Sequence, residues 1–423
     1  VETRLTPETV WQSVTLNQTL CPGSVVHTQA HSRAALLLRN NTVLRLSQKS
    51  TLTLPAAQPD KPFWLELLDG AINVITRTPK KFQVDTPFVN AAVDGTEFFV
   101  KIAENKTTVS VFEGRVIAEN PSGRVILRRG EAATAGADQA PVTSIPVNPR
   151  EAVHWALHYP PILSYRLDDF KEGDASSWQA RVRKSIEYAQ SGDMQNALAS
   201  VIDTPADTPN ATFFGYRASL LLNVGRVNEA SADIKTALDI APNDGIALAL
   251  QSVIAVAQNQ HENALTLAKQ SVVQAPQVAG SWMALSYAHQ ANFNLPEALN
   301  AAQHGADNEP DNALAWARIA ELHLMTGNLD AALAAASKAA ALNPNLARTQ
   351  SVLGFVYLTQ IKTKHARQAF EQAIALDQAD PLPRLGLGLA KIRDGDLAAG
   401  REEIEIATAR DPNNALVRSY MGK

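Results

Sequence analysis

The sequence predicts a multidomain protein, all-β at its N-terminus and followed by an all-α, right-handed solenoid. One observation is a series of prolines that recur at a constant spacing in the second half of the chain: Pro242, Pro276, Pro310 and Pro344. A proline ends a helix, so this spacing, which we call the period, indicates a repeating helical unit of about 34 residues. The other observation is a series of short β-branched and aromatic runs between turn residues in the first third. A solenoid offers a partner a concave surface rather than a catalytic pocket.

Composition limits the classes of protein that fit. The chain has 423 residues, of which 45% are hydrophobic and 19% charged, so it can bury the cores of two or three domains. Its net charge of −4 gives no reason to expect a nucleic-acid partner. Cys21 is the only cysteine, which excludes an intramolecular disulfide. No apolar run approaches the ~20 residues that a membrane-spanning helix needs, so we expect no membrane insertion by this segment.

The β region extends from about residue 23 to residue 135. No helical pattern interrupts it, which favours antiparallel or coiled β architecture over βαβ units. Glycine at the corners permits the positive φ of a tight turn. The runs most typical of strands are 34–38, 42–46, 63–67, 71–75, 98–102 and 107–111. The corners are Asn40-Asn41, Asp69-Gly70, Asp94-Gly95, Glu113-Gly114 and Ser122-Gly123.

Several of these stretches resemble a FecR domain. The distinctive part is Gly95-Thr96-Glu97-Phe98, followed by Glu113-Gly114-Arg115-Val116. The similarity covers roughly residues 20–135 and implies a FecR-like β domain, which we place at 1–135. It also implies a bacterial cell-envelope protein, periplasmic or at the cell surface. The founding FecR proteins are periplasmic parts of iron-siderophore signalling, but their membrane helix and sigma-factor-binding segment have no counterpart in this chain.

A proline-rich connector is expected at 136–175. Pro141, Pro146, Pro149, Pro160 and Pro161 punctuate it, and a short helix is expected from Arg150 to Tyr159. Trp155 and Tyr159 are large for a linker, so we expect a connector that is docked rather than flexible.

The solenoid is expected at 176–423, with about six repeats after an irregular first pair at 177–190 and 193–202. Bulky residues recur one period apart in the first helix of each repeat, and small residues recur in the second, where two helices must approach closely. The bulky residues are Phe214, Leu248, Trp282 and Trp316; the small ones are Ala230, Ala264, Ala298, Ala332 and Ala366, then Gly400. This pattern identifies tetratricopeptide (TPR) repeats. Because Leu353-Gly354 and Leu387-Gly388 recur as Met421-Gly422, we expect an unfinished last helix from a longer protein.

Catalytic and metal-binding motifs are absent from the sequence, so neither an enzyme nor a cofactor is expected. His289 and His323, one period apart, occupy positions where TPRs usually pack a tyrosine, which favours core histidines over metal ligands. His154 and His158 share a helix face in the connector but lack nearby ligand partners.

The remaining candidate site is the concave groove, formed by the first helix of each repeat. Its expected lining is mostly apolar and lacks the basic residues of a carboxylate clamp, which favours an amphipathic helix or extended peptide. The alternative is that the groove packs against another part of the same protein. The candidate partner-binding residues are Ile246, Ala249, Val253, Val256, Met283, Tyr287, Gln290, Leu314, Ala317, Glu321, Leu324, Ser351, Phe355 and Leu358.

The sequence therefore predicts a non-enzymatic interaction scaffold of the bacterial envelope. A protein or peptide partner would bind in the TPR groove and a second component would bind the FecR-like domain. The alternatives are a FecR-type signal relay, or the soluble part of an outer-membrane adhesion or export protein. An outer-membrane protein is a further candidate partner.

Overall fold

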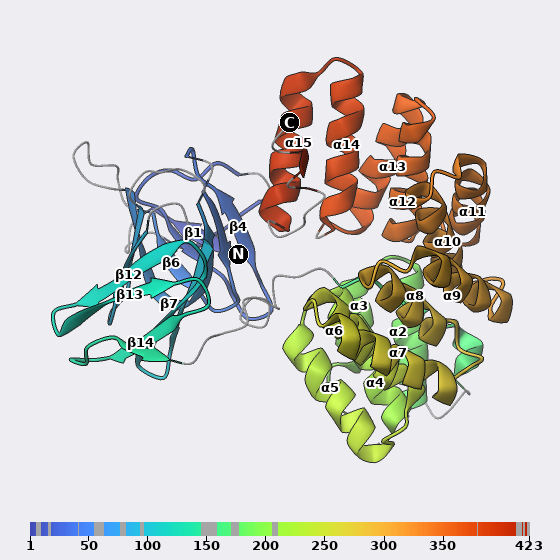
Figure 1. Ribbon diagram of the computed structural model, residues 1–423, viewed down its shortest axis with the longest axis horizontal. Helices are drawn as coiled ribbons and strands as arrows, with labels where there is room; N and C mark the ends of the chain where they lie inside the picture. The colour runs from blue at the N-terminus through green and yellow to red at the C-terminus, as the bar shows by residue number, and fades with distance from the viewer. Residues whose placement is uncertain are drawn as a thin grey trace. The chain divides into compact units, whose positions relative to one another are not determined.

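The computed structural model divides the chain into two compact units, Val1–Ala156 and Leu157–Lys423 (Figure 1). The first unit is built of strands and the second of helices, as the sequence predicts. The residues described are 1–5, 10–15, 18–40, 42–54, 63–76, 82–93, 97–144, 159–170, 177–204, 210–378, 380–411, 417 and 419–420.

The strands of the first unit form one continuous, folded sheet. Every strand pair in the described part is antiparallel except β7 with β8, which is parallel. The sheet continues beyond residue 135, because β14 pairs with β15. The strands are β1 Glu2–Arg4, β2 Gln12–Ser13, β3 Val25–His27, β4 Ala34–Leu37, β5 Val43–Leu46, β6 Thr51–Thr53, β7 Phe63–Ile75, β8 Phe82–Asp85, β9 Asn90–Val93, β10 Glu97–Ala103, β11 Lys106–Glu113, β12 Arg115–Asn120, β13 Gly123–Arg128, β14 Ala132–Gly136 and β15 Val142–Ser144.

One expected corner of the β region is wrong. Asp69-Gly70 does not reverse the chain but lies inside the 13-residue strand β7. Gly70 has φ +85°, and a Cβ atom there would overlap Ser50 Oγ and lie 2.5 Å from Ser50 Cα. Glycine thus lets β7 pair with β6 before this point and with β5 and β10 after it. The two expected strands at 63–67 and 71–75 are one bent strand.

The corner at Glu113-Gly114 is confirmed. Gly114 has φ +80° and joins β11 to β12. The strands on either side bury alternate residues in the core of the unit, among them Val109, Val111 and Val116. The Asp94-Gly95 corner lies outside the described residues.

The helices of the second unit stack as antiparallel pairs (Figure 1). After the first pair, the first helices of six repeats begin at residues 211, 245, 279, 313, 347 and 381. Successive starts are one period apart, so the predicted register is confirmed. The helices are α2 Trp178–Gln190, α3 Met194–Val201, α4 Ala211–Asn223, α5 Val227–Ile240, α6 Gly245–Ala257, α7 His261–Gln274, α8 Ala279–Ala291, α9 Leu295–Asn308, α10 Ala313–Met325, α11 Leu329–Leu342, α12 Ala347–Thr359, α13 Thr363–Leu376, α14 Pro381–Arg393 and α15 Leu397–Arg410.

The packing within the repeats follows the register. The recurring small residues, from Ala230 to Ala366, are fully buried where the two helices of a repeat meet. In the sixth repeat the glycines are required, because a Cβ atom at Gly388 would lie 2.7 Å from Gly400 O. The helix expected in the connector at 150–159 lies almost entirely outside the described residues. The closing Met421-Gly422 also lies outside them.

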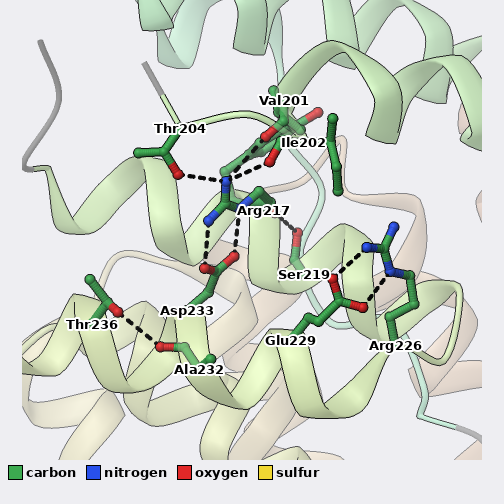
Figure 2. Close-up of polar contacts among 11 residues, drawn as sticks. Val201, Ile202, Thr204, Arg217, Ser219, Arg226, Glu229, Ala232, Asp233 and Thr236 are labelled. Atoms are coloured by element: carbon green, nitrogen blue, oxygen red, sulfur yellow. Dashed lines mark hydrogen bonds and ion pairs between the residues drawn. The ribbon is translucent and has the colours of Figure 1, made fainter. Parts of the chain in front are cut away.

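A buried ion pair ties the first repeat to the pair before it (Figure 2). Arg217 on α4 makes two 2.7 Å bonds to Asp233 on α5, through Nε and Nη2. Its Nη1 atom also donates to Ile202 O at 3.0 Å and to Thr204 Oγ1 at 2.9 Å, beyond the end of α3. One guanidinium therefore joins three consecutive segments, using the fork geometry that lysine lacks.

Candidate peptide-binding groove

The predicted groove residues lie on the first helices α6, α8, α10 and α12, but they are more covered than the sequence suggests. Val253, Met283, Tyr287, Leu314 and Leu358 are buried, together with Ala249, Ala317 and Ser351. Half-buried are Ile246, Val256, Gln290, Glu321, Leu324 and Phe355. The open apolar lining expected from the register is therefore partly filled, and the role of these residues in partner binding stays a prediction.

Part of the cover comes from the chain itself. We call residues 159–170 the docked segment, because its buried residues Tyr159, Ile162 and Phe170 belong to the same apolar core as the solenoid helices. A Cβ atom at Gly280 would overlap Leu163 Cδ2 and lie 3.2 Å from Ile162 O. Gly280 stands one period after Ile246 and one before Leu314. The docked segment thus lies on the face that the register assigns to the groove.

The docked segment has the burial pattern of an extended chain. From Leu163 onward the burial alternates: Leu163, Tyr165 and Leu167 are half-buried, and the residues between them at 164 and 166 are exposed. Ile162, which precedes this alternation, is buried. Alternate side chains of an extended chain point in opposite directions, so this pattern places one row of side chains against the helices. Only at Leu167–Asp169 does the segment turn, in the short 3-10 helix η2.

An aromatic cluster fixes the C-terminal part of the docked segment. The Tyr165 ring lies 4.8 Å from Tyr216 of α4 in an edge-to-face arrangement. Phe170 lies 5.9 Å from Tyr216 and 6.2 Å from Trp178 of α2, again edge to face. Such aromatic pairs each stabilise by about 0.5–1.5 kcal/mol beyond their buried area.

Polar contacts hold the same part of the segment. Arg183 Nη1 of α2 donates to Leu167 O at 2.6 Å and to Phe170 O at 2.8 Å. Tyr216 Oη donates to Ser185 Oγ at 2.8 Å, and Ser185 Oγ donates to Ala197 O at 2.6 Å. The cluster is therefore joined to both helices of the first pair.

The tyrosines of this cluster are strongly desolvated. Burial raises the pKa of Tyr165 well above its ordinary value, and nearby Tyr216 raises it further, although the Ser219 side chain acts in the opposite direction. Burial also raises the pKa of Tyr216. Ser219 stands one period before Val253 and two before Tyr287, so Tyr165 approaches another groove position. Both phenols stay neutral over the physiological pH range.

Farther along the same face is a buried polar cluster, which we call the arginine cluster: Tyr287, Arg318, Glu321 and Arg348. Glu321 forms ion pairs with Arg318 Nη1 at 3.1 Å and with Arg348 Nε at 2.5 Å. The Arg318 guanidinium lies over the Tyr287 ring, 3.9 Å from its centroid. Arg318 Nε also donates to Ser286 Oγ at 3.0 Å, so this almost fully buried cation is fully engaged.

Electrostatics keep the arginine cluster charged. Burial alone would lower the pKa of Arg348, but Glu321, together with Tyr287 and Asp380, outweighs it and holds the pKa above its ordinary value. Burial, with Glu321, raises the pKa of Tyr287. The cluster therefore holds two guanidinium charges, one carboxylate and a neutral phenol.

The prediction from the sequence missed a basic residue of this face. Arg348 lies one period after Leu314 and so occupies a groove position, although the predicted lining lacks basic residues. The register alone could have located it. What the register could not show is that Arg348 is already paired with Glu321 inside the protein, so the face does not present a free carboxylate clamp.

His289 and His323, expected as core histidines, are both only half-buried. The Nδ1 atom of His289 has no hydrogen-bond partner among the described residues. Burial, with Lys269 nearby, lowers the pKa of His289 and favours the neutral ring. Within the described ranges no group of three His, Cys, Asp or Glu side chains is arranged to hold a metal ion. His154 and His158 lie outside the described residues.

The two domains match known families. Residues 24–117 match the family described as FecR protein, and residues 217–279 and 283–347 match the tetratricopeptide repeat family. The chain therefore contains a FecR-like domain and TPR repeats. A comparison with curated proteins finds no match. Both families are generally non-catalytic, and together the domains indicate a protein-interaction or signalling scaffold associated with the bacterial envelope.

Several solved structures are similar to parts of this chain. The APC/C hetero-tetramer Cut9-Hcn1 is similar over 60% of this chain and 51% of its own, at 16% identity and TM-score 0.52. A tetratricopeptide repeat protein from Parabacteroides merdae covers 58% of this chain and 97% of its own, at 15% identity and TM-score 0.40. An anti-sigma factor from Parabacteroides distasonis covers 32% and 68%, at 18% identity and TM-score 0.29. This chain spans about half the length of the Cut9-Hcn1 chain, and at 16% identity that similarity shows the fold alone.

The TPR fold implies protein or peptide partners. In the described part of the chain, no helix combines the length and the apolar character needed to cross a bilayer.

Proposed function

We propose that this protein is a non-enzymatic interaction scaffold of the bacterial envelope, in the periplasm or at the cell surface. The TPR groove would hold a protein or peptide partner, and the FecR domain would bind a second component. The observation that carries the proposal is the docked segment, since Leu163 packs on Gly280 at a groove position in an extended conformation. A face that accepts one extended polypeptide has the shape and apolar character to accept another.

The groove of the last three repeats is the part proposed for the partner. Its half-buried residues include Leu324, Phe355 and Leu389, which give an apolar floor beyond the arginine cluster. Phe355 packs edge to face against Phe370, with ring centroids 4.9 Å apart. Tyr287 is unsuited to probe this surface, because it is buried beneath Arg318.

Site-specific photo-crosslinking tests the proposal. The full chain would carry benzoylphenylalanine at Phe355, and a matched chain would carry it at Val273, which is 74% exposed on a second helix, α7. Irradiation in the intact envelope is expected to give a reproducible protein adduct from Phe355 and none of the same mass from Val273. If Phe355 gives no adduct, or both positions give the same one, the groove does not hold a partner.

The FecR domain is tested in the same experiment. Ile126 on β13 is 51% exposed and accepts the crosslinker without disturbing the core. We expect an adduct different from that of Phe355. A chain that crosslinks only through the solenoid would leave the FecR domain without the proposed second component.

A further inference from the structure

We propose that the groove face of repeats 1–3 is a binding site for an extended peptide with the chemistry of residues 159–167, and that the chain's own docked segment is its displaceable resident. The occupant we commit to is a segment of a partner protein in which prolines precede alternating aliphatic and aromatic residues. This inference rests on the proposed scaffold function and specifies the partner's chemistry and how access to the groove is controlled.

The docked segment is held unevenly along its length. Its C-terminal part is anchored by the aromatic cluster and by Arg183, which donates to the carbonyls of Leu167 and Phe170. Its N-terminal part is held by side-chain packing, because in the part of the chain described no hydrogen bond joins the backbone of 160–165 to a solenoid helix. Displacement of residues 160–165 therefore breaks no backbone hydrogen bond to the helices, while the anchor keeps the segment nearby.

The groove is shaped for a backbone at one position. Gly280 is the second residue of α8, and the atoms nearest to an added Cβ would be Leu163 Cδ2, Ile162 O and Leu163 Cγ. All three belong to the docked segment and none to the solenoid. The absence of a side chain at Gly280 thus leaves space for a chain that crosses α8. This space is not used for packing between helices.

The sequence of the resident indicates what a partner must carry. Pro160 and Pro161 restrict the chain to extended conformations before binding, which reduces the entropy lost on docking. Ile162, Leu163 and Tyr165 then supply the side chains that contact the helices. A partner segment needs the same two features, since exposed positions such as Ser164 make no comparable contact.

Tethering makes the resident an effective competitor. A segment attached to its own site has a local concentration on the order of millimolar. A partner's apparent affinity is its intrinsic affinity multiplied by the fraction of molecules in which the site is open. Weakening the resident is therefore expected to tighten binding of a peptide added in trans.

The test measures binding of a fluorescein-labelled synthetic peptide, Tyr-Pro-Pro-Ile-Leu-Ser-Tyr-Arg-Leu, to the full chain by fluorescence anisotropy. Leu163→Asp places a charge in the row of residues 163, 165 and 167 that faces the helices, and Ser164→Asp places the same charge at the neighbouring exposed position as a matched control. We expect Leu163→Asp to bind the peptide at least ~10-fold tighter than wild type, and Ser164→Asp to bind it as wild type does. Combining Leu163→Asp with Gly280→Leu is expected to abolish binding.

Two further measurements keep the outcome decisive. If Leu163→Asp lowers the helical circular dichroism, the variant Pro160→Gly with Pro161→Gly weakens the resident without changing the inward side chains, and the same tightening is expected. Gly305→Ala, on the second helix α9, is the glycine control, because its added Cβ would meet Ala279 O at 3.4 Å and Trp282 Cβ at 3.5 Å and no atom of the docked segment. This variant is expected to leave peptide binding unchanged.

The inference is overturned if weakening the resident leaves peptide affinity unchanged, or if Gly280→Leu leaves peptide binding intact. It is also overturned if light scattering shows the wild type to be a dimer that exchanges docked segments, since the occupant would then be a second copy. Neither result depends on the adduct from Phe355. If the peptide test fails and Phe355 still crosslinks, only the displaceable docked segment is rejected. If the peptide test succeeds and Phe355 gives no adduct, only the partner of repeats 4–6 is rejected.

Discussion

Replacing Glu321 by glutamine should destabilise the solenoid more than any exposed charge change of the same kind. The carboxylate serves two buried cations, Arg318 at 3.1 Å and Arg348 at 2.5 Å. The side chains are 1% exposed for Arg318, 13% for Arg348 and 14% for Glu321, so water replaces little of what is lost.

The magnitude follows from the burial of these charges. At an effective dielectric constant of about 20, two unit charges ~3 Å apart attract by roughly 5 kcal/mol, and part of this is offset by the desolvation of the carboxylate. Removing one partner of a buried ion pair typically costs about 3–5 kcal/mol. Arg318 keeps its contacts with Ser286 and the Tyr287 ring, so we expect a loss of about 3–5 kcal/mol and not twice that.

Urea unfolding followed by helical circular dichroism measures this change, and hydrogen exchange of the amides in α10 and α12 locates it. Glu402→Gln is the matched control, because Glu402 is exposed on α15, and it should stay within about 0.5 kcal/mol of wild type. Adding Arg348→Met to Glu321→Gln removes one uncompensated cation and should recover part of the loss. A single variant as stable as the control, or a double variant less stable than the single, would refute the role of these charges.

The solenoid could be predicted almost completely from the sequence. Each repeat folds through contacts between residues that are near in sequence, so the recurring prolines and small residues are enough to place the helices. Even the irregular first pair is found, because Ser177 and Asp193 accept hydrogen bonds from the first turns of α2 and α3.

The β unit was less predictable, for a physical reason that Gly70 illustrates. Asp-Gly is the local signature of a reversal, and the positive φ that it implies is present. Whether such a residue turns the chain or bends one strand depends on the strands beside it, and Ser50 approaches from a distant part of the sequence. Local pattern carries no information about that neighbour.

The face proposed as the groove follows from the register, but the segment that covers part of it does not. The register places Ile246, Gly280 and Leu314 on one face because each follows the previous one by a single period. What covers that face is a non-repeating segment, whose contacts no periodicity encodes. The available signal was the pair Pro160-Pro161 followed by apolar residues, which predicts a docked connector but not where it docks.

Two further predictions concern buried polar groups outside the arginine cluster. Asp233→Asn leaves the Arg217 guanidinium without its carboxylate and should destabilise the solenoid by about 2–4 kcal/mol in urea unfolding. This lies at the lower end of the range for buried pairs because carbonyl acceptors of Arg217 remain. A loss below about 0.5 kcal/mol would contradict the prediction. The other is alkaline unfolding, because the folded pKa values of Tyr165, Tyr216 and Tyr287 are raised above the unfolded value of about 10. A raised folded pKa contributes stability that is fully present below pH ~10 and is lost progressively as pH rises above that value. Spectrophotometric titration of the seven tyrosines should therefore show three phenols that ionise only together with loss of helical circular dichroism. If all seven ionised near pH ~10 while the helical signal stayed intact, these side chains would not be desolvated in the groove.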